Sequence, residues 1–249
     1  MVRVAGLVIP KLPGEKDKNY LEFERLAREA AKQGAQIVCT PEGFLEGYIV
    51  QNATLEKYRE LCEEIPYGPH VIKMRDLARE LKIHIVAGLA EKDAKHQYNT
   101  AIVISPDGEV VGRHRKVHNA GDEPHNATGT TFSAFDISLA RVGMMICYDR
   151  QMPESARLLA VKGTQIIFTP SSGMFGGIND SIMVTRAYEN SVYVVFVHPQ
   201  DCLVISPRGD IMARYSGGSR VVMADLDISL VGHGTITGRK PALYKDLTK

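Results

Sequence analysis

The sequence predicts a mixed α/β protein in which two sheets pack on each other with helices outside. Three observations support this fold class: strongly apolar runs of strand length, amphipathic helical patterns between them, and two hairpin signals. Runs that are apolar at nearly every position are typical of strands covered on both faces. Six such runs occur, at residues 2–9, 35–40, 83–89, 142–147, 165–169 and 192–198.

Three helices are expected between these runs, because apolar side chains recur there on one helical face. A glycine follows the first and third patterns, and a proline precedes the second and opens the third, which are common helix boundary signals. The patterns cover residues 21–31, 71–81 and 153–162.

Two Ser-Pro-x-Gly turns, at residues 105–108 and 206–209, each join two short apolar strands. Such turn residues predict hairpins, one over residues 100–113 and one over residues 202–213. We expect each half of the chain to add one hairpin to its own sheet. No short-period repeat or low-complexity linker divides the chain, so residues 1–249 are expected to form a single domain.

Composition narrows the class of protein. The chain is 44% hydrophobic and 24% charged, with a net charge of +1, which is ordinary for a globular protein and excludes fibrous or disordered classes. No basic stripe is present, so nucleic acid is not an expected partner. The apolar runs are far shorter than the ~20 residues that span a bilayer, and the first is too short for a signal peptide. We therefore expect a cytoplasmic protein that does not enter a membrane.

The four cysteines lie far apart with no Cys-x-x-Cys pair, which argues against a disulfide framework, a zinc ribbon or a redox dithiol. Cys147 stands out because it ends a buried run just before a helix begins. A nucleophile on such a turn is exposed at a sheet edge, where backbone N–H groups can face a developing oxyanion. The alternative for any single cysteine is simple core packing.

Two further residues could support a nucleophilic thiol. Glu42 follows the buried run 35–40 in a Thr-Pro-Glu-Gly segment, where a partly desolvated carboxylate could act as a general base. Lys116 follows the first hairpin in a basic segment that could supply one inward-facing cation. Alone, the carboxylate could equally belong to a loop or a helix cap, and the basic segment to a solvated face.

Taken together, these residues and their surroundings resemble the nitrilase superfamily, also called the carbon-nitrogen hydrolases. The resemblance runs almost from end to end and rests on six motifs in the family's order. They are Pro41-Glu42-Gly43 with Gly47-Tyr48, residues 112–118, residues 145–149, Pro153-Glu154 with Arg157, residues 186–190 and residues 239–244.

The resemblance implies that Cys147 is the nucleophile, Glu42 the general base and Lys116 the cation that stabilises the tetrahedral oxyanion. The backbone N–H of Tyr148 would complete the oxyanion hole. A thiolate would attack a C–N carbonyl, ammonia or an amine would leave, and water would hydrolyse the thioester. We also expect the nearby lysine to lower the pKa of the thiol.

Family members often have a second glutamate shortly after the lysine. Glu123 fits that place, with Asp122 beside it as the alternative. The resemblance further implies a four-layer α-β-β-α sandwich, a homodimer or higher homo-oligomer, and chemistry that needs no metal or organic cofactor.

The substrate class is less defined, because plain amides, ω-amides, N-carbamoyl compounds and nitriles all suit the same residues. Nitrilases tend to have Trp-Glu after the cysteine, whereas this chain has Tyr-Asp, which favours an amidase-type enzyme acting on a small amide or ureido substrate. The alternatives are an N-carbamoyl amine or amino acid amidohydrolase, then a nitrilase, an acyltransferase, or a non-catalytic binding homologue. Expected substrate-binding residues are Tyr48, Tyr148, Arg150, Ser171 and Ser172.

Arg150 could bind a substrate carboxylate through both of its terminal nitrogens, or it could be a solvated loop arginine. A metal site is not expected at His114, His118 and His125, whose spacing matches no zinc pattern. Four charged residues near the motifs suggest an ion-pair and capping network, with substrate contact as the alternative. These are Glu154, Arg157, Arg186 and Glu189.

Overall fold

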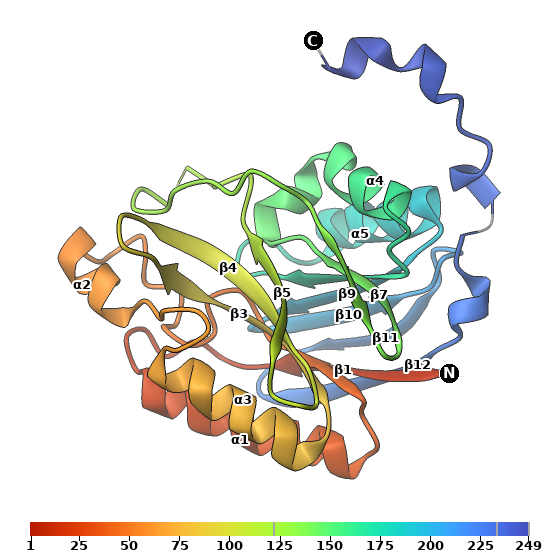
Figure 1. Cartoon of the computed structure of the whole chain (residues 1–249). Coiled ribbons are helices and arrows are strands. Elements are labelled where there is room, and N and C mark those ends of the chain that lie inside the picture. The colour runs from red at the N-terminus through yellow and green to blue at the C-terminus, as the bar shows by residue number, and fades with distance from the viewer. Residues whose placement is uncertain (122, 233, 249) are drawn as a thin grey trace.

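The computed structural model describes residues 1–121, 123–232 and 234–248, and it has four layers (Figure 1). Two six-stranded mixed sheets pack face to face, and helices cover their outer sides. This arrangement confirms the predicted α-β-β-α sandwich.

The first sheet is built mainly from the N-terminal half. Its strands are β1 (Val2–Val8), β2 (Ile37–Cys39), β3 (His84–Lys92), β4 (Gln97–Ile104), β5 (Val110–Arg115) and β12 (Arg220–Leu226), in the spatial order β12-β1-β2-β3-β4-β5. The second sheet contains β6 (Ala134–Ile137), β7 (Ala140–Met144), β8 (Ile166–Pro170), β9 (Tyr193–His198), β10 (Asp201–Ile205) and β11 (Ile211–Ser216), in the order β11-β10-β9-β8-β7-β6.

The two sheets repeat one pattern of strand directions. In the first, β1, β2 and β3 are parallel, and β4 and β5 continue antiparallel. In the second, β7, β8 and β9 are parallel, and β10 and β11 continue antiparallel. Parallel neighbours need long crossover connections, which here contain helices. The two predicted hairpins are β4–β5 and β10–β11, while short connections that were not predicted, at residues 93–96 and 199–200, join β3 to β4 and β9 to β10.

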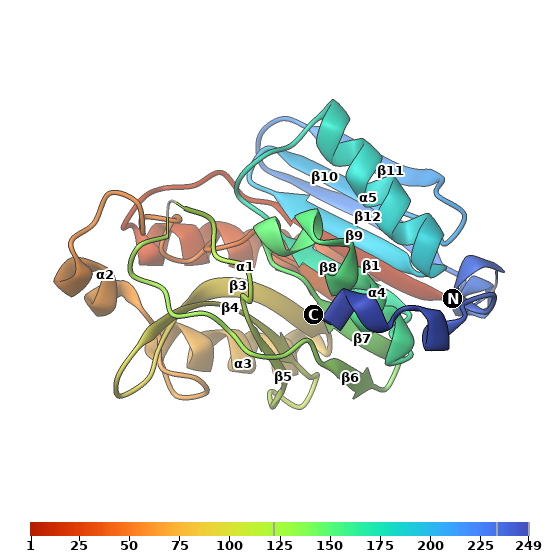
Figure 2. The same ribbon diagram turned by 90° about the horizontal axis from the view of Figure 1, so that it is seen from above.

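The helices α1 (Lys16–Lys32) and α3 (Pro69–Leu81) cover the first sheet, while α4 (Pro153–Val161) and α5 (Gly177–Asn190) cover the second (Figure 2). A short helix, α2 (Leu55–Leu61), lies beyond the end of the first sheet. Among the described residues, no helix is both long and apolar enough to cross a membrane.

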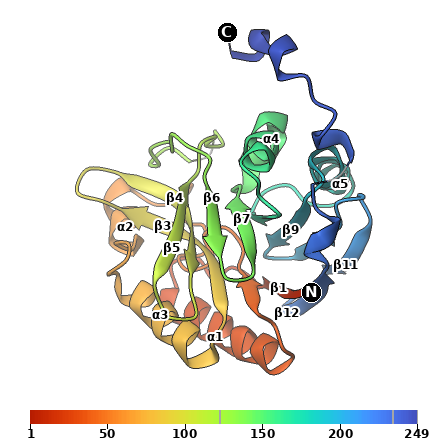
Figure 3. The same cartoon turned by 45° about the vertical axis from the view of Figure 1, so that its right-hand side comes forward.

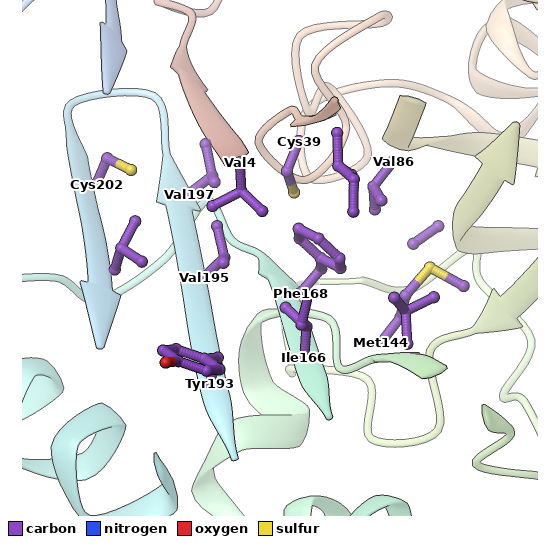
Figure 4. Packing of buried hydrophobic residues seen from close by; sticks show 14 of the residues in the cluster. Val4, Cys39, Val86, Met144, Ile166, Phe168, Tyr193, Val195, Val197 and Cys202 are labelled. Atoms are coloured by element: carbon purple, nitrogen blue, oxygen red, sulfur yellow. The ribbon is translucent and has the colours of Figure 1, made fainter. Parts of the chain in front are cut away.

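The central core lies between the sheets (Figure 4). Alternate side chains of each strand point into it, as the period of two requires: in β3, Val86 joins this core, while Ile85 and Ala87 pack toward α1 and α3. Both faces of the central strands are therefore buried, which explains why these strands read as continuous apolar runs.

The structure differs from the sequence prediction at several elements, among them three strands, one turn and the short helix α2, which was not expected. The run at 142–147 is strand only to Met144, and Cys147 opens a 3₁₀ turn (Cys147–Gln151). β6 and β12 were not predicted, and β12 pairs antiparallel with β1, where Leu226 lies opposite Val2. The hairpins β4–β5 and β10–β11 each lie in the sheet of their own half, as expected, whereas β12 from the C-terminal half joins the first sheet. After β12, the described residues include short 3₁₀ turns at Ile228–Leu230, Gly234–Ile236, Pro241–Leu243 and Lys245–Thr248, and the last two of these turns extend away from the sheets (Figures 1 and 3).

Gly88 in β3 controls how closely the strand approaches the segment after β2. A Cβ atom at this position would lie 2.6 Å from the carbonyl oxygen of Pro41 and 2.9 Å from the Cα atom of Glu42. Backbone atoms cannot rotate away, so Gly88→Ala is expected to displace that segment and lower the free energy of unfolding by about 1–3 kcal/mol. Denaturant unfolding measures this change. Gly218→Ala, whose Cβ would meet nothing within 4 Å, is the control; equal stability of the two variants would contradict the prediction.

Candidate active site

Strand ends bring the candidate residues together. Glu42 lies just after β2, Lys116 just after β5, and Cys147 shortly after β7. The two sheets meet directly at this point, because the backbone N–H of Glu42 donates to the carbonyl of Ser171, which follows β8, at 3.3 Å. Sites at the carboxyl ends of parallel strands are common in α/β proteins.

Lys116 forms the centre of a buried charge cluster. Its Nζ donates to Oε1 of Glu42 at 2.8 Å and to Oε1 of Glu123 at 2.9 Å, and none of these three side chains is exposed. Asn99, which lies in β4, donates through Nδ2 to the same two oxygens at 2.7 and 2.6 Å. The second carboxylate oxygen of Glu42, Oε2, is buried and has no hydrogen-bond partner among the described residues.

This cluster holds the lysine in its charged form. Burial alone would lower the pKa of Lys116, but the charge of Glu42, that of Cys147 when it is ionised, and that of Glu123 outweigh burial and raise this pKa above its ordinary value. Burial and the charge of Glu42 raise the pKa of Glu123, against the opposing effect of Lys116. One ammonium thus faces two carboxylates, and the neutral Asn99 amide supplies a second donor to both.

Cys147 occupies a constrained turn at the edge of this cluster. Its φ is +43°, a left-handed conformation that costs a non-glycine residue roughly 1–2 kcal/mol, and its side chain is almost fully buried. Lys116 lowers the pKa of Cys147, as expected, and so does Arg150, but burial and the charge of Glu42 raise that pKa by more. The pKa of Cys147 therefore lies above its ordinary value, and the thiol keeps its proton.

Asp149 ties the cysteine turn to the lysine segment. Its Oδ2 accepts from the N–H of Ile146 at 3.0 Å and pairs with Nε2 of His114 at 3.0 Å. Its Oδ1 accepts from the N–H of His118 and pairs with Nδ1 of the same residue, both at 2.9 Å. Burial would raise the pKa of Asp149, but its hydrogen bonds to the two histidines hold that pKa well below the usual range. One carboxylate thus fixes both loops that carry Cys147 and Lys116.

The expected substrate-binding residues differ in their contacts and in how far they are exposed. The hydroxyl of Tyr48 donates to Oε1 of Glu123 at 3.1 Å, and Oγ of Ser172 accepts from Lys11 at 2.7 Å. Ser171 is buried beside Glu42, whereas Tyr148 is 41% exposed.

Arg150 is not a solvated loop arginine, because only 1% of its surface is exposed. Its Nη1 lies 3.2 Å from the sulfur of Cys147. Asp122, the alternative to Glu123, lies outside the described residues.

Of the four charged residues near the motifs, Arg186 and Glu189 have structural partners, whereas Nη1 of Arg157 is buried and has no hydrogen-bond partner among the described residues. Arg186 pairs with Glu189 at 3.0 Å and donates to the carbonyl of Arg150 at 3.1 Å, which agrees with an ion-pair network that supports the turn. His125 contacts the carbonyl of Ala53, away from the two histidines on Asp149. In the described part of the chain, no three His, Cys, Asp or Glu side chains are grouped as metal ligands would be.

Sequence reasoning missed Asn99. The available signal was a short group of polar residues, Gln97, Asn99 and Thr100, directly before the apolar part of the hairpin that leads to Lys116. A buried amide of that kind must find partners, and here the partners are the two glutamates.

Comparison with known proteins identifies the family. The carbon-nitrogen hydrolase family model matches residues 2–234. A nitrilase from Pyrococcus abyssi is 37% identical over 99% of this chain and 97% of its own length. An omega-amidase (NIT2) from Homo sapiens is 32% identical over 90% of this chain and 88% of its own.

Solved structures show the same fold. An amidase from Nesterenkonia sp. superposes with a TM-score of 0.83 at 21% identity, covering 99% of this chain and 96% of that one. A carbon-nitrogen hydrolase from Helicobacter pylori G27 gives a TM-score of 0.87 at 21% identity, covering 100% and 98%. The chain belongs to the carbon-nitrogen hydrolase family of the nitrilase superfamily, and it is a hydrolase of C–N bonds.

The Asp149–His118 pair predicts a pH-dependent stability. The hydrogen bond to Asp149 raises the pKa of His118 above its ordinary value of 6.5. The stabilisation that His118 contributes to the folded state is therefore complete below about pH 6.5, the pKa of this histidine in the unfolded chain. It is lost as the pH rises through the higher pKa of His118 in the folded state. His118→Asn should reduce the free energy of unfolding most below pH 6.5 and less at higher pH, as followed by denaturant unfolding across pH. The exposed His96 provides the control, His96→Asn; a deficit for His118→Asn that grew with pH would refute the assignment.

Proposed function

We propose that this chain hydrolyses small linear amides and releases ammonia through a thioester on Cys147. The observation that carries the proposal is the free Oε2 of Glu42. Oε1 of Glu42 is occupied by Lys116 and Asn99, so Oε2 is the atom left to exchange protons, and the charge of this carboxylate reaches the thiol of Cys147.

The first half of the reaction forms the thioester. The S–H bond of Cys147 breaks, its proton passes to Oε2 of Glu42, and the thiolate attacks the carbonyl carbon of the amide. Negative charge then develops on the carbonyl oxygen, where Lys116 and the backbone N–H of Tyr148 stabilise it. Glu42 returns the proton to the substrate nitrogen, which leaves as ammonia.

The second half restores the enzyme. Glu42 accepts a proton from water, and the resulting hydroxide attacks the thioester carbonyl. The carboxylic acid leaves and the proton returns to the sulfur of Cys147. Glu123 keeps Lys116 in place throughout, and no step requires a metal or an organic cofactor.

Several residues would position the substrate. Tyr48 reaches Glu123 and so borders the cluster, while Ser171 and Ser172 lie on the loop that follows β8. The exposed Tyr148 adjoins the nucleophile in the chain. We assign these four side chains to the binding pocket of a small molecule.

An amide is favoured over a nitrile because Tyr148-Asp149 follows the nucleophile, and because Glu42 can protonate a leaving amine. The related proteins carry both names, nitrilase for the archaeal one and omega-amidase for the human one. An N-carbamoyl compound is the second candidate. Its support is the guanidinium of Arg150 beside the nucleophile, which could meet a carboxylate on the substrate.

We also propose that two copies associate through the outer helices of the second sheet. Large apolar side chains are exposed there: Leu158 and Val161 on α4, and Ile178 and Tyr188 on α5. Sedimentation equilibrium is expected to give a dimer or a higher oligomer, and a charged substitution at Ile178 should weaken it. A monomer at micromolar concentration would contradict this.

Free thiols at all four cysteines suit a reducing compartment such as the cytoplasm.

Replacement of the nucleophile tests the mechanism. Cys147→Ala should lower amide turnover at least ~10³-fold while circular dichroism stays unchanged, because no other group can form the acyl intermediate. Ammonia release is the readout, and mass spectrometry of the wild type quenched during turnover should show an acyl group on the peptide that contains Cys147. The matched control is Cys62→Ala, another buried free thiol, which should retain activity. Activity of Cys147→Ala within tenfold of wild type would overturn the assignment.

The substrate class is tested with matched compounds. For an amide, an N-carbamoyl compound and a nitrile that share one side chain, kcat/KM should be lowest for the nitrile, because this ratio compares transition-state stabilisation. A nitrile preferred by more than about tenfold, which corresponds to ~1.4 kcal/mol, would exclude an amidase-type enzyme.

A further inference from the structure

Arg150 is held rigidly with one nitrogen on the nucleophile. Its Nε donates to Oδ1 of Asn179 on α5 at 2.7 Å, and Nη2 donates to the carbonyl of Met174 at 2.6 Å. Nη1 is left facing the sulfur of Cys147 at 3.2 Å. The guanidinium also lies 5.6 Å from the ring centre of Phe196. Two fixed hydrogen bonds on the far edge thus aim the third nitrogen at the thiol.

Charge balance explains why an arginine is needed at this place. The buried site contains two carboxylates, Glu42 and Glu123, and two cations, Lys116 and Arg150. Lys116 is shared between the carboxylates, so Arg150 is the cation that touches the sulfur. When the proton of Cys147 moves to Glu42, the negative charge moves from oxygen to sulfur and the net charge of the site stays the same.

The guanidinium offsets the features that keep the thiol protonated. Burial and the charge of Glu42 raise the pKa of Cys147. Arg150 and Lys116 both lower it, and the effect of Arg150 is the larger of the two. A hydrogen bond from a cation to an ionised acceptor is roughly twice as strong as one between neutral groups. The contact between Nη1 and sulfur should therefore strengthen once the thiolate forms.

We propose that Arg150 is a further catalytic residue that stabilises the thiolate of Cys147 after its proton has passed to Glu42. The step breaks the S–H bond, forms an O–H bond on Oε2 of Glu42, and involves no oxidation or leaving group. This role rests on Cys147 being the nucleophile but not on the identity of the substrate. It differs from binding a substrate carboxylate, because it operates in the free enzyme.

Alkylation by iodoacetamide, which is neutral and has no carboxylate, tests this role without any turnover. The rate of Cys147 modification is followed by mass spectrometry from pH 5 to 10 for the wild type, Arg150→Gln and Arg150→Lys. The midpoint of the Arg150→Gln profile should rise by at least about one pH unit, which lowers the rate near pH 7 about tenfold. Arg150→Lys keeps the charge but loses the planar fork, so its midpoint should lie between the other two.

The control is Arg75→Gln, which removes another mostly buried arginine that donates to backbone carbonyls, here of Gly108 and Pro66. Its alkylation profile should match the wild type. Circular dichroism identifies any misfolded variant. If Arg150→Gln does not fold, the profile of Arg150→Lys tests the proposal. An unchanged midpoint in the folded Arg150 variants would overturn the proposal.

Steady-state kinetics provide a second readout. With a neutral amide, Arg150→Lys should lower kcat more than it raises KM. If it raised only KM, and only for substrates that bear a carboxylate, Arg150 would be a substrate contact and the proposal would be wrong. If the wild type hydrolysed no amide, the proposed function would fail, while the alkylation profiles would still decide the role of Arg150.

Discussion

The bridge of Lys116 between Glu42 and Glu123 is the interaction on which the rest of the site depends. Each of these charges would be expensive to bury alone, and their mutual attraction offsets that cost only when the geometry is closely matched. The match requires two connections to meet at one place: the one after β2, which carries Glu42, and the one between β5 and β6, which carries both Lys116 and Glu123. Asn99 adds a neutral donor to both carboxylates from inside a strand.

The fold supplies this geometry through its rigid layers. The central strands are buried on both faces, so their ends cannot shift without disturbing two cores at once. Asp149 extends this rigidity to the loops, because it binds both the turn of Cys147 and the segment of Lys116. The left-handed backbone of Cys147 is a local strain that such a surrounding can maintain, and strain of this kind is common at functional sites.

Much of this arrangement could be predicted from the sequence because its signals are local. Continuous apolar runs indicated strands buried on both sides, the Ser-Pro-x-Gly turns indicated hairpins, and Glu42 and Cys147 were conspicuous as polar residues at the ends of apolar runs. The pairing of β12 with β1 could not be predicted, since it joins strands from opposite ends of the chain and has no local signal. The same holds for the contact of Arg150 with sulfur, which depends on Asn179 and Met174.

The net pKa of the thiol could not be predicted for a related reason. The expected lowering by Lys116 is present, but the sequence does not show how completely Cys147 is buried or that the charge of Glu42 acts on it, and these two effects are larger. Desolvation is a property of the assembled layers. Burial also affects the proposed reaction. The proton moves from Cys147 to Glu42, two buried groups, and the total charge of this pair does not change.

A charge-removal cycle tests the central claim that Lys116 and its carboxylates form one balanced buried unit. Lys116→Met leaves two uncompensated carboxylates and should lower the free energy of unfolding at pH 7 by about 3–5 kcal/mol. The triple variant Glu42→Gln, Lys116→Met, Glu123→Gln removes all three charges and should recover most of that loss in denaturant unfolding. A triple variant no more stable than Lys116→Met alone would contradict the account.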